Sequence, residues 1–490
     1  MRTPHAVTAA GVFAAGCLAR STTLTPEALV HDVRAGELQS TLWNLNRIAN
    51  ENGGNRAYGT PGYLASVDFV LERAQIRFGR KFDTYLQEFN HTYDELLKIS
   101  VTGPDGEGLP VVVSPIYNPP TPTEGITAPL LNTPVDKAYG SMCWEDQWDG
   151  VNATGKLVLI RRGGCDVHTK LTHAKKNRAL GVILYNNVGP KISKPTLFAE
   201  KIDDALPVGI IPRNIGMEWA SRLDAGEDMQ VTLVVDTILE TRPSWNVISQ
   251  TTQGDPDKVI MIGAHLDSVP EGPGINDDGT GTTALLEIME AVEHYEGYPH
   301  SIRFAWWGSE EGGLVGSTFY TSELTPEEAD KIKYYFNYDM IGSPNPMFGV
   351  MSDNNSGIGA QLLEDYLTDA GKEVTYRQFD NRSDYAGFVA LGIPSTGLFT
   401  GEGEHDPCYH QACDTIDNVD LDALTLNTKA AAHALGTLAS SLEGVPKRAN
   451  VTPNLRRRRK TATNFQLWKT LAEEAGRGHS CAHGKMKLTV

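Results

Sequence analysis

The second half of the chain alternates short apolar runs with segments of helical periodicity, and this alternation limits the fold more than any other feature. Residues 259–262 and 302–307 are apolar runs typical of buried strands, and between them 282–295 carries apolar residues at helical spacing. The same pattern continues through strands expected at 334–340 and 395–399 and helices expected at 383–391 and 424–442. It predicts an α/β sheet with active residues at the strand ends.

The first half has two contrasting parts. Residues 36–50 and 62–77 place apolar side chains at helical spacing, which predicts two helices. A proline-rich stretch from 115 to 134 follows, and we expect it to lack regular structure. Beyond it, short apolar runs separated by Gly and Asn predict strands of a compact β-rich module at 157–160, 182–184 and 231–235.

Five short polar motifs lie at or just beyond the predicted elements of the second half. They occupy residues 263–267, 274–279, 308–312, 337–340 and 408–413. Together they contain two histidines and several carboxylates, a combination that suits zinc, and a carboxylate can bridge two ions. Each motif alone is common on a protein surface, but five in order at element ends indicate a metal centre.

The spacing within these motifs assigns roles. His265 and Asp267 are two residues apart on an extended segment, so their side chains share a face. Asp267 could therefore orient the imidazole without binding the metal itself. Glu310 and Glu311 are adjacent and point different ways, so one can bind metal while the other faces the attacking water. A disulfide between Cys408 and Cys413 would hold the loop that carries His410.

These motifs resemble those of the co-catalytic di-zinc aminopeptidases of the aminopeptidase Y and bacterial leucyl aminopeptidase type. The resemblance covers about residues 36–110 and 243–443. It implies that two zinc ions are bridged by one carboxylate, with one His and one further carboxylate at each ion. The ligands implied are Asp277 as the bridge, His265 and Asp339 at one ion, and Glu311 and His410 at the other.

The same resemblance implies the remaining catalytic groups. Glu310 resembles the general base, Tyr409 the hydroxyl that steadies the tetrahedral intermediate, and Arg382 the arginine that contacts substrate. A cis peptide bond between Asp277 and Asp278 is also expected. The implied fold is α/β, a mixed-sheet zinc exopeptidase domain with helices on both faces.

The inserted region 110–239 resembles a β-rich protease-associated domain, whose disulfide would join Cys143 and Cys165. We expect a lid or spacer without catalytic residues. The expected order is a signal peptide at 1–19, the first part of the peptidase domain at 20–109 (which a short pro-segment could open), the protease-associated domain at 110–239, the catalytic part at 240–445 and a basic, disordered tail at 446–490.

The composition of the chain limits the kinds of partner that it can bind. The net charge of −18 argues against a nucleic-acid or anionic-membrane surface, and no run of about 18 apolar residues occurs that could span a membrane. The signal sequence, the paired cysteines and the sequons point to secretion or the vacuolar lumen. Glycosylation is expected at Asn90, Asn152, Asn354 and Asn450. The sequon at Asn381 adjoins Arg382, so we expect it to be unoccupied.

The predicted function is release of N-terminal, Leu-like or broadly hydrophobic residues from peptides with a free N-terminus, by a monomer. A carboxypeptidase on the same fold is one alternative, but Arg382 alone does not supply the positive groups it needs. A glutaminyl cyclase needs only one zinc. A catalytically silent, receptor-like protein is the other alternative, and such a protein would be expected to have lost ligands that this sequence keeps.

Overall fold

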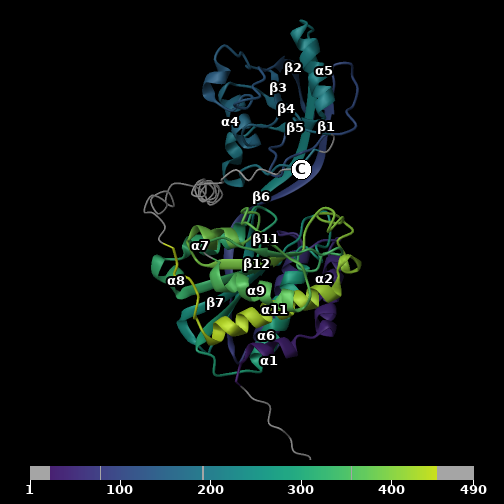
Figure 1. Cartoon of the computed structure of the whole chain (residues 1–490). Coiled ribbons are helices and arrows are strands. Elements are labelled where there is room, and N and C mark those ends of the chain that lie inside the picture. The colour runs from purple at the N-terminus through teal and green to yellow at the C-terminus, as the bar shows by residue number, and fades with distance from the viewer. Residues whose placement is uncertain (1–22, 78, 190–191, 355, 450–490) are drawn as a thin grey trace, which may run out of the picture.

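The computed structural model describes residues 23–77, 79–189, 192–354 and 356–449, and they form two lobes (Figure 1). The predicted signal peptide, Asn450 and most of the predicted basic tail lie outside the described residues. Two long antiparallel strands connect the lobes: β1 (Phe82–Thr102) pairs with β6 (Gln230–Thr251).

The larger lobe is built on a mixed sheet in the order β11-β10-β12-β9-β7-β8-β6, with β1 paired to β6. Strands β8, β7, β9 and β12 run parallel, whereas β6 and β10 run antiparallel to their neighbours β8 and β12. The strands are β7 (Asp255–His265), β8 (His300–Trp307), β9 (Ile332–Tyr338), β10 (Phe348–Met351), β11 (Val374–Arg377) and β12 (Ser395–Phe399).

Helices cover both faces of this sheet, because the central strands carry apolar residues on both sides. In β7, Ile260 and Ile262 join one core cluster while Val259 and Met261 join the other. Against the first face pack α1 (Pro26–Asp32), α2 (Ala35–Glu51), α3 (Pro61–Glu72), α6 (Gly279–Glu293), α9 (Gly357–Asp369) and α11 (Leu421–Ser440). Against the second pack α7 (Val315–Glu323), α8 (Pro326–Lys331) and α10 (Tyr385–Ala390). The expected fold class is confirmed.

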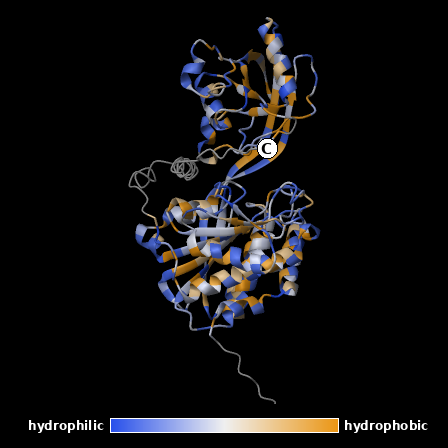
Figure 2. Ribbon diagram, in the orientation of Figure 1, coloured by the Kyte–Doolittle hydropathy of each residue, from blue (hydrophilic) through white to orange (hydrophobic). Residues whose placement is uncertain are grey.

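The smaller lobe continues the sheet from β6 through four parallel strands, again with a buried core on each face. Its strands are largely coloured as hydrophobic in Figure 2. Its elements are β2 (Ile126–Asn132), β3 (Leu157–Arg161), α4 (Val167–Lys176), β4 (Gly181–Tyr185), β5 (Val208–Ile211) and α5 (Arg213–Asp224). The short helices of the chain are η1 (Arg73–Arg77), η2 (Glu145–Trp148), η3 (Ala199–Asp204) and η4 (Ile416–Asn418). No helix within the described ranges is long and apolar enough to cross a membrane.

Strand β2 contradicts the expectation that the whole proline-rich stretch lacks regular structure. Pro129 is the last residue paired with β6, opposite Gln230, and pairing with β3 begins only at Leu130. A proline has no N–H to donate to a sheet, and Pro129 lies where the strand changes partners. The prediction was therefore wrong for 126–132.

Candidate active site

The candidate ligands lie at one edge of the sheet. His265 ends β7, Glu310 and Glu311 follow β8, and Asp339 follows β9. Since these three strands are parallel, their carboxyl ends meet at the same edge. The loops before α6 and after β12 bring Asp277 and His410 to the same place.

Asp277 is central because each of its carboxylate oxygens faces a different histidine. Oδ1 lies 3.0 Å from Nε2 of His265, and Oδ2 lies 3.1 Å from Nε2 of His410. Asp339 Oδ1 is 3.7 Å from the same His265 nitrogen, and Glu311 Oε2 is 3.1 Å from the same His410 nitrogen. Two groups of three potential ligands therefore share one carboxylate, and within each group the ligand atoms lie within 4.8 Å of one another.

The donor atoms fit bound cations. Glu311 Oε1 and Asp339 Oδ1 are buried and have no hydrogen-bond partner among the described residues. A buried charged oxygen without a partner is costly, and a metal ion would satisfy it. Imidazole nitrogens and carboxylate oxygens together are a donor set that zinc accepts.

Electrostatics in the cluster favour positive charge. Burial opposes protonation of His410, yet the carboxylates of Glu311 and Asp277 outweigh it and raise its pKa to about 11. Burial likewise opposes the charge of His265, but Glu310, Asp277 and Asp339 together raise its pKa well above the usual value. Burial raises the pKa of Glu311 to about 7. An excess of carboxylates that attracts protons also attracts cations.

Glu310 lies beside the ligand cluster, with Oε2 3.9 Å from Nε2 of His265 and 7 % of the residue exposed. Burial raises the pKa of its carboxyl group well above the ordinary value. A carboxylate with a raised pKa next to a cation site is typical of a general base.

Asp267 acts on the site in a different way from the one expected. Its backbone carbonyl, 3.0 Å from His265 Nδ1, orients the imidazole, whereas its carboxylate lies 3.9 Å from that nitrogen. The carboxylate instead accepts the backbone N–H groups of Glu310 at 3.0 Å and Glu311 at 3.2 Å. Asp267 therefore holds both the histidine and the glutamate turn.

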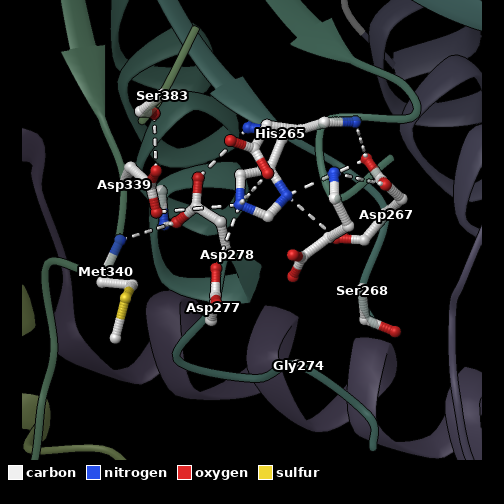
Figure 3. A network of polar contacts seen from close by, with 12 residues as sticks. His265, Asp267, Ser268, Gly274, Asp277, Asp278, Asp339, Met340 and Ser383 are labelled. Atoms are coloured by element: carbon white, nitrogen blue, oxygen red, sulfur yellow. Dashed lines mark hydrogen bonds and ion pairs between the residues drawn. The ribbon is translucent and has the colours of Figure 1, made fainter. Parts of the chain in front are cut away.

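Asp278 is a supporting residue that the sequence analysis did not assign. Its carboxylate accepts the backbone N–H groups of His265 and Met340 (Figure 3) and also that of Gly281. It therefore ties together the end of β7, the start of α6 and the segment after β9. The peptide bond between Asp277 and Asp278 is cis, as the resemblance implies. An Asp directly before a helical segment is a capping signal that could have identified it.

Arg56 was missed altogether. Its side chain is fully buried and donates to the carbonyl oxygens of Pro273 at 2.9 Å, Gly274 at 2.6 Å and also Leu266. These carbonyls belong to the loop between His265 and Asp277, so Arg56 fixes the path between two candidate ligands. No local motif surrounds this arginine in the sequence.

Tyr409 and Arg382 line a cavity of about 330 Å³ together with four of the candidate ligands, Asp277, Glu311, Asp339 and His410. The Tyr409 ring stacks on His410 with 3.8 Å between centroids. Arg382 is held by two carboxylates: Nη1 lies 2.9 Å from both oxygens of Glu402, and Nε lies 2.7 Å from Asp380. Both residues therefore lie where a bound substrate could reach them.

Within the described ranges, disulfide bonds join Cys143 to Cys165 in the smaller lobe and Cys408 to Cys413 around His410. Among the sequons, Asn90, Asn152 and Asn354 are exposed, while Asn381 is half-buried and lines the cavity.

Known proteins are similar to this chain in sequence and in fold. Residues 246–435 match the model of peptidase family M28, and residues 126–219 match that of the PA domain. An aminopeptidase of Pseudomonas aeruginosa is 36% identical over 86% of this chain and 84% of its own length, and aminopeptidase Y of Saccharomyces cerevisiae is 32% identical over 86% and 82%. An aminopeptidase structure from Aneurinibacillus aligns over 87% of this chain and 98% of that chain, with a TM-score of 0.72 and 24% identity. The chain therefore belongs to peptidase family M28, is a peptide hydrolase and carries a PA domain.

Proposed function

We propose that this protein is a zinc-dependent aminopeptidase that binds two zinc ions. The observation that carries the proposal is the pair of ligand groups that share Asp277. His265 and Asp339 would hold one ion and Glu311 and His410 the other. Relatives named aminopeptidases, and a Bacillus subtilis zinc aminopeptidase whose structure aligns with a TM-score of 0.61, support the same activity.

Bound zinc would lower the pKa of water and polarise the substrate carbonyl. Side chains of the protein supply the proton transfer and the stabilisation of the oxyanion. Glu310 takes a proton from the attacking water and passes it to the leaving amine. The hydroxyl of Tyr409 donates to the oxyanion that develops on the carbonyl. The carboxylate of Asp267 keeps Glu310 in place by accepting the backbone N–H of Glu310.

Substrate selection follows from the cavity. The carboxylates around the metal site attract a free amino terminus, so a single residue is removed per turnover. Met340, Met351, Leu398 and Phe399 are among the residues that line the cavity, and these apolar side chains favour Leu-like residues. Arg382 also lines this cavity and serves as a substrate contact.

We further propose that the chain is secreted or vacuolar and acts as a monomer. Two disulfides support an oxidising compartment, and three exposed sequons are open to glycosylation. The proposed domain limits are 110–239 for the protease-associated domain and 240–445 for the catalytic part. The family matches, 126–219 and 246–435, lie inside these limits.

Leucine 4-nitroanilide and its N-acetyl form test the proposal directly. Zinc-replete protein should hydrolyse the free amine, and blocking the amine should remove activity because the amino terminus is the anchor. Liberation of 4-nitroaniline is followed by absorbance. Equal turnover of the blocked form would contradict the proposal and indicate an endopeptidase, and no turnover of either would favour a carboxypeptidase or a silent protein.

Zinc binding should weaken in acid. His410 has a pKa of about 11 without a bound ion, so zinc must displace its proton at neutral pH. Displacing one proton per ion lowers the apparent affinity about tenfold for each pH unit, and protonation of Glu311 below about pH 7 steepens this fall. Chelator competition at pH 8, 7 and 6 measures it. Two equivalents of zinc bound with an affinity independent of pH would contradict the ligand assignment.

A further inference from the structure

A tyrosine of the smaller lobe reaches into the candidate active site. Tyr117 lies in the core of the smaller lobe with 1 % of its surface exposed. Its hydroxyl donates to the backbone carbonyl of Gly312 at 3.0 Å. Gly312 directly follows Glu311, so the contact falls on the turn that carries both catalytic-site glutamates.

A histidine of the connecting strand β1 completes the arrangement. His91 Nε2 lies 2.6 Å from the Tyr117 hydroxyl, and burial lowers the pKa of His91 to about 3, so its ring is neutral. A tyrosine hydroxyl has one proton, and Tyr117 gives it to the Gly312 carbonyl when the neutral His91 ring carries its own proton on Nε2. In that tautomer the hydrogen bonds run from β1 through Tyr117 to the glutamate turn.

The space around Gly312 is closed. A Cβ atom at this position would lie 2.6 Å from His91 Nε2 and 2.8 Å from the Tyr117 hydroxyl. The turn is thus held from two sides, because the Asp267 carboxylate binds the N–H groups of Glu310 and Glu311 while Tyr117 binds the carbonyl of Gly312.

Tyr117 is itself fixed within the smaller lobe. The next residue, Asn118, is buried and bonded to both the N–H and the carbonyl of Val208, and its own carbonyl accepts the hydroxyl of Thr237. The preceding residue, Ile116, pairs with the segment around Thr196, which lines the active-site cavity. A second link, Lys194 to Glu271 at 3.2 Å, joins the same segment to the loop between His265 and Asp277.

We propose that Tyr117 is a positioning residue for the reaction: it holds the Glu310–Gly312 turn from the smaller lobe, so the inserted lobe forms part of the active site and is more than a spacer. This inference rests on the proposed aminopeptidase function.

Tyr117→Phe tests the inference, with Tyr93→Phe as its matched control. The control also removes one tyrosine hydroxyl near the connection between the lobes, but that hydroxyl donates to Glu95 on the same strand and also interacts with Arg242, neither of which belongs to the glutamate turn. Two readouts are taken on zinc-saturated protein: hydrogen exchange of a peptide covering 308–314, and kcat and KM for leucine 4-nitroanilide.

The expected result is exchange about three- to tenfold faster in 308–314 and kcat about three- to tenfold lower in Tyr117→Phe, the effect of one lost hydrogen bond. KM should change less than twofold and zinc content not at all. Tyr93→Phe should match wild type. Unchanged exchange, unchanged kcat or a rise in KM alone would overturn the inference. A wild type inactive on both anilides would instead refute the proposed function, while the exchange experiment would still report whether Tyr117 holds the turn.

Discussion

Glu310→Gln should lower kcat for leucine 4-nitroanilide by at least about 100-fold, the contribution typical of a general base. Glutamine cannot accept the proton of the attacking water. It keeps the size of the side chain, and the backbone N–H that binds Asp267 is untouched. Zinc content should therefore stay at the wild-type value, because Glu310 is not one of the five proposed ligands.

Glu404→Gln is a suitable control for this experiment. Glu404 lies near the cavity on an exposed loop, with 90 % of its side chain in solvent, so its substitution should leave kcat and zinc content unchanged. Metal analysis and steady-state kinetics on the same samples separate the two effects. Near-normal turnover in Glu310→Gln would rule out the base assignment, and a matching loss of zinc would show that Glu310 is a ligand.

Arg56→Met is the substitution expected to destabilise the protein most, by about 3–5 kcal/mol in the free energy of unfolding. Methionine fills most of the space but leaves the carbonyls of Pro273 and Leu266 without the Arg56 donor in a buried site. It also removes a positive charge that interacts electrostatically with Asp267, Asp414 and Asp278. The loop between the candidate ligands should then lose its fixed path, and zinc affinity should fall with stability.

Urea denaturation in the presence of EDTA measures this loss without the contribution of bound zinc. Arg47→Met is the matched control: Arg47 is exposed and pairs with Glu51 one turn away, an interaction worth about 0–1 kcal/mol. If both variants unfold at the same urea concentration, Arg56 does not hold the loop as its hydrogen bonds indicate.

The residues that surround the candidate metal site were predictable because each stands in a short polar motif, either at the end of a strand or in a loop between elements. Their supports were not. Arg56 lies more than 200 residues from every carbonyl it binds, and Asp414 reaches back to the N–H groups of Asn276 and Asp277. Neither residue has a neighbour in sequence that reveals its partner, so only the folded chain shows the contact.

The strands likewise include some that the sequence predicts and one that it does not. Strands β7 and β8 are buried on both faces, so their apolar runs predict them well. Strand β1 was missed because much of its length is exposed or half-buried and its sequence is mixed. Its pairing with β6 crosses a sequence gap longer than 100 residues, and the composition of a single strand does not encode such a partner.

The pairing of β1 with β6 also places the smaller lobe, in sequence, between the two halves of the larger lobe. Residues 23–81 of the larger lobe are synthesised before the smaller lobe, while the central strands β7 to β9 emerge after it. The smaller lobe is continuous in sequence between the two connecting strands and can fold as a unit during synthesis. Once folded, it holds Thr102 opposite Thr232, so β1 and β6 can pair along their length down to Phe82 and Thr251. The folded smaller lobe then already holds the two halves of the larger lobe close together in space. Joining these halves therefore costs less loop-closure entropy than it would across an unfolded insertion.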